Sequence, residues 1–148
     1  WDKFKPLELQ TPDEILKGVI KGFSEATGNL IEMTVFKKSD LQKIGSQLSA
    51  QFQFELVLHS KYVKGYSFSV LELAYNIELY PFFILLDGDF YKELNNIPTF
   101  DKKAMIIESQ ENWAKTIELL FKSKQFNKIV SGLMKIASIE LNKIQTKI

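Results

Sequence analysis

The sequence predicts an α+β domain in which helices cover one face of a mostly antiparallel sheet. The stretch from Gln51 to Leu86 is the densest apolar and aromatic run of the 148-residue chain, and much of it alternates with the period of a strand. Segments with helical spacing of apolar residues precede and follow it, and the strands are separated by short turns, as in an antiparallel meander. We therefore expect an N-terminal helix, three to five strands and two C-terminal helices packed on one sheet face, in a single domain over residues 1–148.

Residues 1–10 are predicted to form an extended lead-in to the first helix. They mix aromatic, charged and proline residues. Their large apolar side chains are expected to pack on the body of the domain, where water would be excluded from them. These side chains are Trp1, Phe4 and Leu7.

The clearest helix begins after Thr11, which we predict to be its N-cap. Glu14 follows three residues later and would complete a capping box, in which each side chain bonds to the other residue's backbone N–H. Gly28 is expected to end this helix. Gly18 and Gly22 lie inside it, where each costs roughly 1 kcal/mol relative to alanine. That cost predicts close approach of a neighbouring element at these glycines.

Five segments have the alternating or continuous apolar pattern of strands. Residues 30–37, 51–60 and 66–75 alternate, so that apolar and polar side chains point to opposite faces. Residues 76–86 end in a run that is apolar on both faces, as in a covered strand. One more short strand is predicted within residues 103–109.

Pro81 lies inside the predicted 76–86 strand. Proline cannot donate a backbone hydrogen bond, so it is expected at an edge position or at a bulge. An edge strand offers its unpaired backbone groups to another chain. A homodimer formed through this strand, or through the last helix, is therefore one predicted assembly.

Two further helices are predicted after the last strand. Ser109 is expected to cap a helix that ends near residue 123, and the last helix covers about residues 125–145 with an apolar stripe along it. Residues 87–103 are predicted to be a long polar connection. Residues 38–50 are ambiguous between a short helix and a loop.

The sheet is expected to have one covered face and one partly exposed face. Alternate apolar residues from Phe52 to Leu58 would point toward the helices. The opposite face is expected to carry acidic residues and a histidine, mixed with tyrosine and serine. These charged and titratable residues are Glu55, His59, Glu72 and Glu78.

Composition excludes several kinds of chemistry. All 19 basic residues are lysine, so a bidentate guanidinium site for carboxylate or phosphate and an arginine finger are impossible. The chain has no cysteine and one histidine, which excludes thiol nucleophiles and zinc sites of the usual composition. Apolar runs are too short for a transmembrane helix. We expect no cofactor, no membrane association and a cytoplasmic location.

The segment that begins Asp87-Gly88-Asp89 resembles the start of a calcium loop. A calcium loop needs glycine at its sixth position and glutamate at its twelfth. Here the glycine is at the second position, and Pro98 occupies the twelfth. A solvated turn is therefore the preferred interpretation, and no metal site is predicted.

A Ser-His-Asp triad would have to use His59, and the sequence has no Gly-x-Ser-x-Gly elbow. Paired carboxylates remain, because Glu55, Glu72 and Glu78 share a predicted face and could act as acid and base. Ordinary solvated sheet charges are the simpler interpretation. A metal-dependent nuclease would also need a Glu-x-Lys step on a strand beside other acids, and this step is missing.

Charge argues against nucleic acid as the partner. The net charge is only +1, although residues 101–148 hold nine lysines against five acidic residues. The order of elements matches a double-stranded-RNA-binding domain in outline, but the helix after the sheet begins at residues 109–112 without the lysines that phosphates require. One face of the last helix could still contact phosphates or an acidic protein, although a solvated face is the simpler interpretation. Its lysines are Lys124, Lys128, Lys135 and Lys143.

These observations favour a non-enzymatic protein-binding domain that sequesters a partner protein. An immunity protein or antitoxin, or a regulator in a phage or defence system, is its concrete form. The alternative is a small carboxylate-dependent hydrolase or nuclease, with Mg²⁺ as the metal if it needs one. The side chains predicted to bind the partner are Glu55, His59, Glu72, Glu78, Asp87, Asp89 and Tyr91.

Overall fold

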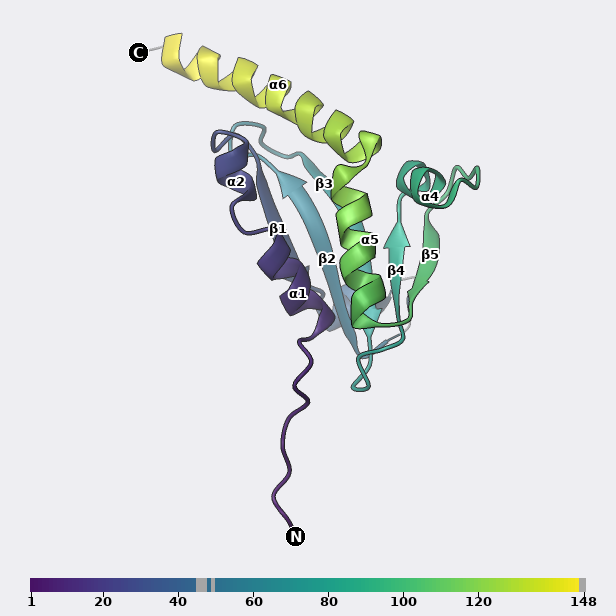
Figure 1. The fold of residues 1–148 in the computed structure, drawn as a ribbon. Coiled ribbons are helices and arrows are strands. Elements are labelled where there is room, and N and C mark those ends of the chain that lie inside the picture. The colour runs from purple at the N-terminus through teal and green to yellow at the C-terminus, as the bar shows by residue number, and fades with distance from the viewer. Residues whose placement is uncertain (45–47, 49, 147–148) are drawn as a thin grey trace.

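The computed structural model describes residues 1–44, 48 and 50–146, apart from the side chains of Leu41 and Ile44. Its architecture confirms the predicted α+β fold (Figure 1). The N-terminal helix, the antiparallel sheet and the two C-terminal helices occur in the expected order. Part of the ambiguous 38–50 segment forms a short helix, and the remainder includes residues outside the described part of the chain.

The sheet is an antiparallel meander in which every strand pairs with the next strand along the chain. Turns join β2 to β3 and β3 to β4, whereas the connection from β1 to β2 contains a short helix. Each strand adds to the edge of the previous one without a crossover. The edge strands are the first and the last. In sheet order the strands are β1 (Glu32–Lys37), β2 (Phe52–His59), β3 (Ser67–Tyr75), β4 (Phe82–Leu86) and β5 (Lys103–Ile107).

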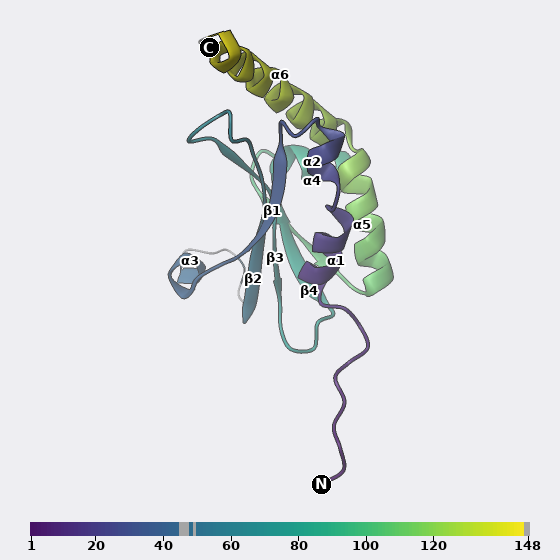
Figure 2. The ribbon, with the colours of Figure 1, turned by 90° about the vertical axis from the view of Figure 1, so that its left-hand side faces the viewer.

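Helices cover one face of this sheet, and Figure 2 shows the sheet edge-on between that layer and the short α3 on the other side. The helix α1 lies beside α5 over the sheet, and the long α6 crosses the end of the helix layer (Figure 1). The helices are α1 (Pro12–Val19), α2 (Phe23–Ala26), α3 (Asp40–Ile44), α4 (Gly88–Asn95), α5 (Gln110–Lys122) and α6 (Lys124–Thr146).

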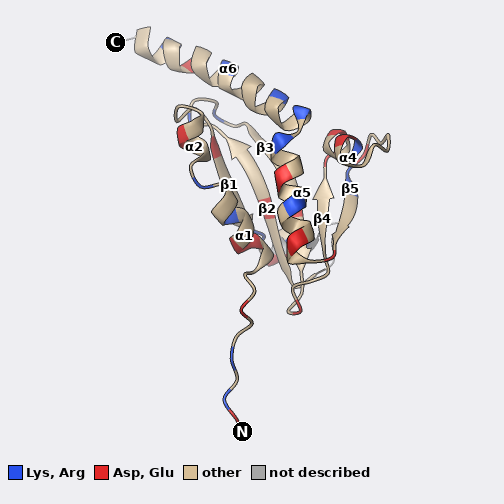
Figure 3. Cartoon of the chain, viewed as in Figure 1, with Lys and Arg blue, Asp and Glu red and all other residues tan. Residues whose placement is uncertain are grey.

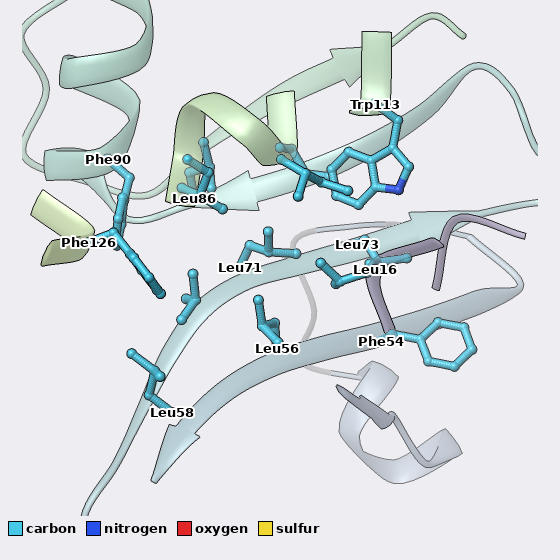
Figure 4. Packing of buried hydrophobic residues seen from close by; sticks show 14 of the residues in the cluster. Leu16, Phe54, Leu56, Leu58, Leu71, Leu73, Leu86, Phe90, Trp113 and Phe126 are labelled. Carbon is cyan, nitrogen blue, oxygen red and sulfur yellow. The ribbon is translucent and has the colours of Figure 1, made fainter. Parts of the chain in front are cut away.

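The core lies between the helix layer and the sheet, as Figure 4 shows. The strands contribute alternate residues such as Leu56, and α1 contributes Leu16. Trp113 of α5 is fully buried, and its indole N–H donates to the backbone oxygen of Pro12 over 3.0 Å. The Trp113 and Phe82 rings meet edge to face with centroids 5.1 Å apart. These contacts fasten both α1 and α5 to the sheet.

A β-bulge lies where β2 pairs with β3. Leu56 is opposite Leu71, but the next residue of β2, Val57, is opposite Ser69, so β3 has one extra residue at this point. Both Val70 and Leu71 therefore enter the core. Beyond the bulge the alternation is shifted by one, which turns Glu72 to the face away from the helices.

The first helix is shorter than predicted. It ends at Val19, and a separate short helix, α2, follows a turn at Gly22, whose φ of 82° is in the left-handed region that favours glycine. The prediction that a neighbouring element approaches closely at Gly18 and Gly22 is wrong. A Cβ at either glycine would meet no described atom within 4 Å. Thr11 is the N-cap as predicted, but among the described atoms its hydroxyl makes no capping hydrogen bond.

The predicted 76–86 strand is also shorter. Residues 76–81 form the turn between β3 and β4, and Pro81 is the last residue of that turn. The strand β4 lies between β3 and β5 and is paired on both sides. It is therefore not an edge strand, and the predicted pairing of a Pro81-bearing edge with a second copy is wrong.

The predicted polar connection 87–103 contains a helix, α4. Asp87 is its N-cap, and its carboxylate accepts a hydrogen bond from the N–H of Asp89 over 3.3 Å. Gly88 permits close approach here, since a Cβ would meet the backbone carbonyl carbon of Phe100 at 3.0 Å. Phe90 anchors the helix in the core.

The lead-in is extended, but it does not pack on the domain. Trp1, Phe4 and Leu7 are largely exposed, and the segment extends away from α1 (Figures 1 and 2). The expected packing of these side chains is therefore wrong. In the described part of the chain, no helix has a stretch that is both long and apolar enough to cross a membrane.

Candidate functional site

The candidate site is the face of the sheet that points away from α1 and α5, which we call the open face. Its residues alternate with core residues on each strand, and the antiparallel registers place them side by side. Along β1 to β5, the open face consists of Glu32, Thr34, Phe36, Gln53, Glu55, Val57, His59, Ser67, Ser69, Glu72, Ala74, Phe83, Leu85, Ala104 and Ile106.

A cluster of charged side chains occupies the middle of the open face. Glu55 and Glu72 are directly opposite each other in the β2–β3 register. The Lys38 ammonium donates a hydrogen bond to Glu72 Oε1, and the Lys102 Nζ lies 3.8 Å from Glu72 Oε2. The Lys38 and Glu72 side chains are only 11% and 12% exposed. Two lysines thus compensate Glu72, and the largely buried Lys38–Glu72 pair is held in place.

Burial lowers the pKa of Lys38, because the charged ammonium loses part of its hydration. The negative charge of Glu55 opposes this and raises the pKa, whereas the positive charge of Lys102 lowers it further. The charges of Glu55 and Lys102 therefore shift the pKa of Lys38 in opposite directions, and the loss of hydration makes the overall shift a lowering. This is the only lysine in the described part of the chain for which such a shift is resolved.

His59 lies at one end of the open face, where it is fixed by side chains of β1. Its Nε2 is 2.9 Å from the hydroxyl of Thr34, and its Nδ1 is 3.7 Å from Glu32 Oε2. Along β2 it is separated from Glu55 by Val57, which also points to the open face. His59 therefore belongs to a separate small polar group beside the charged cluster.

The structure brings together only some of the predicted partner-binding residues. Glu55, His59 and Glu72 share the open face, as the sequence predicted. Glu78 is exposed in the turn between β3 and β4 and does not belong to that face, so its predicted placement is wrong. The acidic face is also less acidic than expected, because Glu72 is paired with two lysines.

The other three predicted residues belong to α4, at the end of β4. Asp87 caps the helix, Asp89 lies in its first turn, and Tyr91 packs against the core. They extend from the C-terminal end of β4, whereas Glu78 precedes its N-terminal end. The predicted set is therefore divided between the open face, one turn and one helix.

Sequence reasoning missed the apolar part of the open face. Phe83 of β4 and Ile106 of β5 are directly opposite each other, with exposed fractions of 47% and 46%. Phe36 of β1 is 51% exposed and lies opposite Glu55. The alternation of β1 predicted the side on which Phe36 lies, but the continuous apolar pattern of β4 gave no reason to expect Phe83 at the surface.

The segment between β1 and β2 covers another part of this face. Leu48 and Ala50 pack on Ala74 and Leu85. The buried Gln53 amide donates to the backbone oxygens of Leu48 and Ala50 over 3.1 and 3.2 Å, which holds this stretch against the sheet. The charged cluster therefore lies beside a covered strip, with exposed apolar side chains at its borders.

The carboxylates do not assemble a metal site among the described residues, where no group of three or more acidic, histidine or cysteine side chains is placed to hold an ion. The chemistry that the open face offers is binding through apolar contact and compensated charge. Comparison with known proteins found no matching family model, curated protein or solved structure. The case for function therefore depends on this geometry.

Proposed function

We propose that this chain is a non-enzymatic protein-binding domain that holds its partner on the open face. One observation carries the proposal: Phe83 and Ile106 form an exposed apolar pair on a sheet face where the central Glu72 is already paired with Lys38 and Lys102. Exposed apolar patches bordered by polar groups are typical of protein interfaces. Covering this pair would remove apolar surface from water without leaving an unpaired buried charge.

The concrete form we propose is an immunity protein or antitoxin, or a regulator in a phage or defence system, that sequesters one protein. The support is the kind of surface: a rigid sheet that offers contact area and is held by its own ion pairs. Such a protein forms a stable complex and performs no turnover. Its partner should present apolar side chains that fit around Phe83 and Ile106.

The experiment compares variants of the open face in binding to the partner. The partner is recovered with the tagged chain from cells that encode it, identified by mass spectrometry and purified separately, and its affinity is measured by calorimetry. Phe83→Lys and Ile106→Lys should each weaken binding by about tenfold or more, because each places an unpaired charge in a desolvated contact.

Ile97→Lys is the matched control, since Ile97 is 52% exposed but lies outside the sheet. It should leave the affinity unchanged. Equal affinities for the wild type and both open-face variants would exclude the open face as the binding site.

A second function is favoured by one observation, the half-buried Lys38 beside Glu55 and Glu72. Such a group is also what a carboxylate-dependent hydrolase or nuclease would use, with the lysine orienting a nucleophile. Hydrolysis of a nucleic acid or ester by the wild type that is lost in Glu72→Gln, with the fold preserved, would establish this alternative and contradict the binding proposal.

A further inference from the structure

The distal half of α6 forms a cleft with the turn between β2 and β3. The helix has 23 residues and crosses the end of the helix layer (Figure 1). The cleft has a volume of about 460 Å³, and we call it the α6 cleft. Ile136 and Ile144 of α6 face Tyr62 and Val63 of the turn across it, and Lys61 and Lys64 complete the turn side.

The helix α6 also carries large apolar side chains that the core does not cover. Phe126, Leu133 and Ala137 are buried in the main core. Ile136 and Ile144 line the cleft instead and are 50% and 51% exposed. Covering the exposed part of each isoleucine would remove apolar surface from water, which favours binding. The floor of the cleft is therefore an apolar surface that a ligand can bury.

The turn side of the α6 cleft is positively charged through Lys61 and Lys64, whereas the one charged residue that α6 contributes to the lining is Glu140. The helix carries four lysines and a single acidic residue, Glu140 (Figure 3). Glu140 is compensated by Lys143, whose Nζ lies 3.1 Å from its carboxylate. On the other wall, Lys61 and Lys64 are exposed, and the Nζ of Lys61 is 5.2 Å from the centroid of the Tyr62 ring. A ligand in the cleft thus meets an apolar floor beside a cationic turn, and the one acidic lining residue is compensated by Lys143.

We propose that the α6 cleft binds an acidic amphipathic segment of a partner protein. Leucine-like side chains of the segment would cover Ile136 and Ile144, and its aspartates or glutamates would lie beside Lys61 and Lys64. This surface is separate from the open face, so the proposal does not depend on the function proposed above. It adds a second contact and specifies the charge of what binds there.

The charge and the shape of the cleft decide between possible ligands. A second copy of this chain would bring two lysine-rich α6 helices together, and their like charges would repel. Nucleic acid would match the lysines but would leave Ile136 and Ile144 uncovered. A lipid bilayer requires apolar side chains on a projecting surface, whereas these isoleucines lie inside a cleft beside the β2–β3 turn. A protein segment is the ligand that fits both features.

The test uses two synthetic amphipathic peptides that share a leucine stripe and differ in carrying glutamate or lysine on the polar face. Binding to the full chain is measured by fluorescence anisotropy, and the contact is located by amide chemical shifts. The glutamate peptide should bind, with shifts at Ile136 and Ile144, and the lysine peptide should not. The double variant Lys61→Glu/Lys64→Glu should weaken binding at least about tenfold, because two attractive charges become repulsive. Ile136→Ser should weaken it as well.

Lys3→Glu/Lys5→Glu is the matched control: it makes the same charge change in the exposed lead-in, far from α6 (Figure 1). It should retain full affinity, and so should Phe83→Lys, which separates this proposal from the open face. Failure of the glutamate peptide to bind, equal binding of both peptides, or an affinity unchanged in the cleft variants would overturn the proposal.

Sedimentation of the wild type with phosphatidylglycerol vesicles that is lost in Ile136→Ser would assign the cleft to a membrane instead. A dimer that this substitution dissociates would assign it to a second copy.

Discussion

At the scale of single residues, Tyr75 and Asp13 form the most buried side-chain link between the sheet and α1. The Tyr75 hydroxyl donates a hydrogen bond to Asp13 Oδ1 over 2.6 Å, and both residues are less than 10% exposed. Lys17 lies 3.5 Å from the other oxygen of the same carboxylate. Burial raises the pKa of Tyr75, and the hydrogen bond to Asp13 raises it further. The neutral phenol is therefore the form that the fold stabilises.

Replacing Tyr75 with phenylalanine should destabilise the fold, because it removes a hydrogen bond to a charged group and leaves Asp13 buried with less compensation. We expect a loss of about 1.5–3 kcal/mol in the free energy of unfolding at neutral pH. Urea unfolding followed by circular dichroism measures it. Tyr66→Phe is the control, since Tyr66 is exposed and should change stability by less than about 0.5 kcal/mol.

The same pair predicts a pH dependence with a defined sign. Because the pKa of Tyr75 is raised in the folded state, the unfolded chain loses the phenolic proton first as pH rises above 10.0, its ordinary value. The stabilisation from Tyr75 is complete below that pH and is lost as pH rises toward the folded-state pKa. The difference in stability between the wild type and Tyr75→Phe should therefore shrink above pH 10. A constant difference across this range would contradict the link.

The candidate site shows what residue-level patterns can and cannot predict. The alternation of β2 placed Glu55 and His59 on the open face correctly, because alternation is a property of neighbouring residues. Lys38 and Glu72 are 34 residues apart, and they meet because β1 and β3 both lie beside β2. Local sequence patterns relate residues only a few positions apart, so they could not predict an ion pair between residues so far apart in the chain.

At the scale of elements, the first helix ends because of Gly22, which the sequence pattern had placed inside the helix. The sequence pattern continues past Val19, but the chain turns at Gly22 with a positive φ. Gly18 has ordinary helical surroundings and open space around its Cα. The backbone at Gly22 therefore requires glycine, whereas the backbone at Gly18, four residues earlier, can accept a side chain.

Substitution of each glycine by alanine should separate these roles. Gly18→Ala should stabilise the fold by about 0.5–1 kcal/mol, since alanine has the higher helix propensity and the new methyl group meets open space. Gly22→Ala should destabilise it by about 1–2 kcal/mol, because a Cβ disfavours a left-handed conformation. Thermal unfolding of both variants tests the pair. A gain at Gly22 would mean that the helix runs through this position.

Contacts between elements also set the start of α6. The side chain of Glu93, which belongs to α4, accepts hydrogen bonds from the N–H groups of Lys124 and Gln125 over 2.7 and 2.9 Å. These are backbone donors that a helix cannot satisfy by itself. Both the helix α4 and its capping of α6 were missed from the sequence. A short helix within a polar stretch has too little periodicity to detect, and its cap on α6 depends on tertiary packing.

At the scale of the whole molecule, the fold divides the sheet into a face that stabilises it and a face available for binding. Phe82 and Phe83 are neighbours in β4 and show this division most directly. Phe82 is 1% exposed against Trp113, whereas Phe83 is on the open face. Because both are phenylalanines of the same strand, a difference between the effects of substituting them reflects the sheet face on which each one lies.

Phe82→Ala should cost about 3–5 kcal/mol in the free energy of unfolding, as expected for a fully buried phenylalanine. Phe83→Ala should cost less than about 1 kcal/mol, since much of its ring is already in contact with water. Chemical unfolding of the two variants under the same conditions provides the measurement. Similar losses at both positions would mean that the open face is covered in the folded protein.

The sequence by itself determined the order of the five strands and the main helices, the alternation of β1 and β2, the cap at Ser109 and the long last helix. All of these depend on residues within one or two turns of each other, where periodicity and local hydrogen bonds act. The tertiary structure alone decided the bulge in β3, the lysines that compensate Glu72, and the exposure of Phe83. Those features depend on which strands are neighbours and in which register, and that is set by packing of the whole chain.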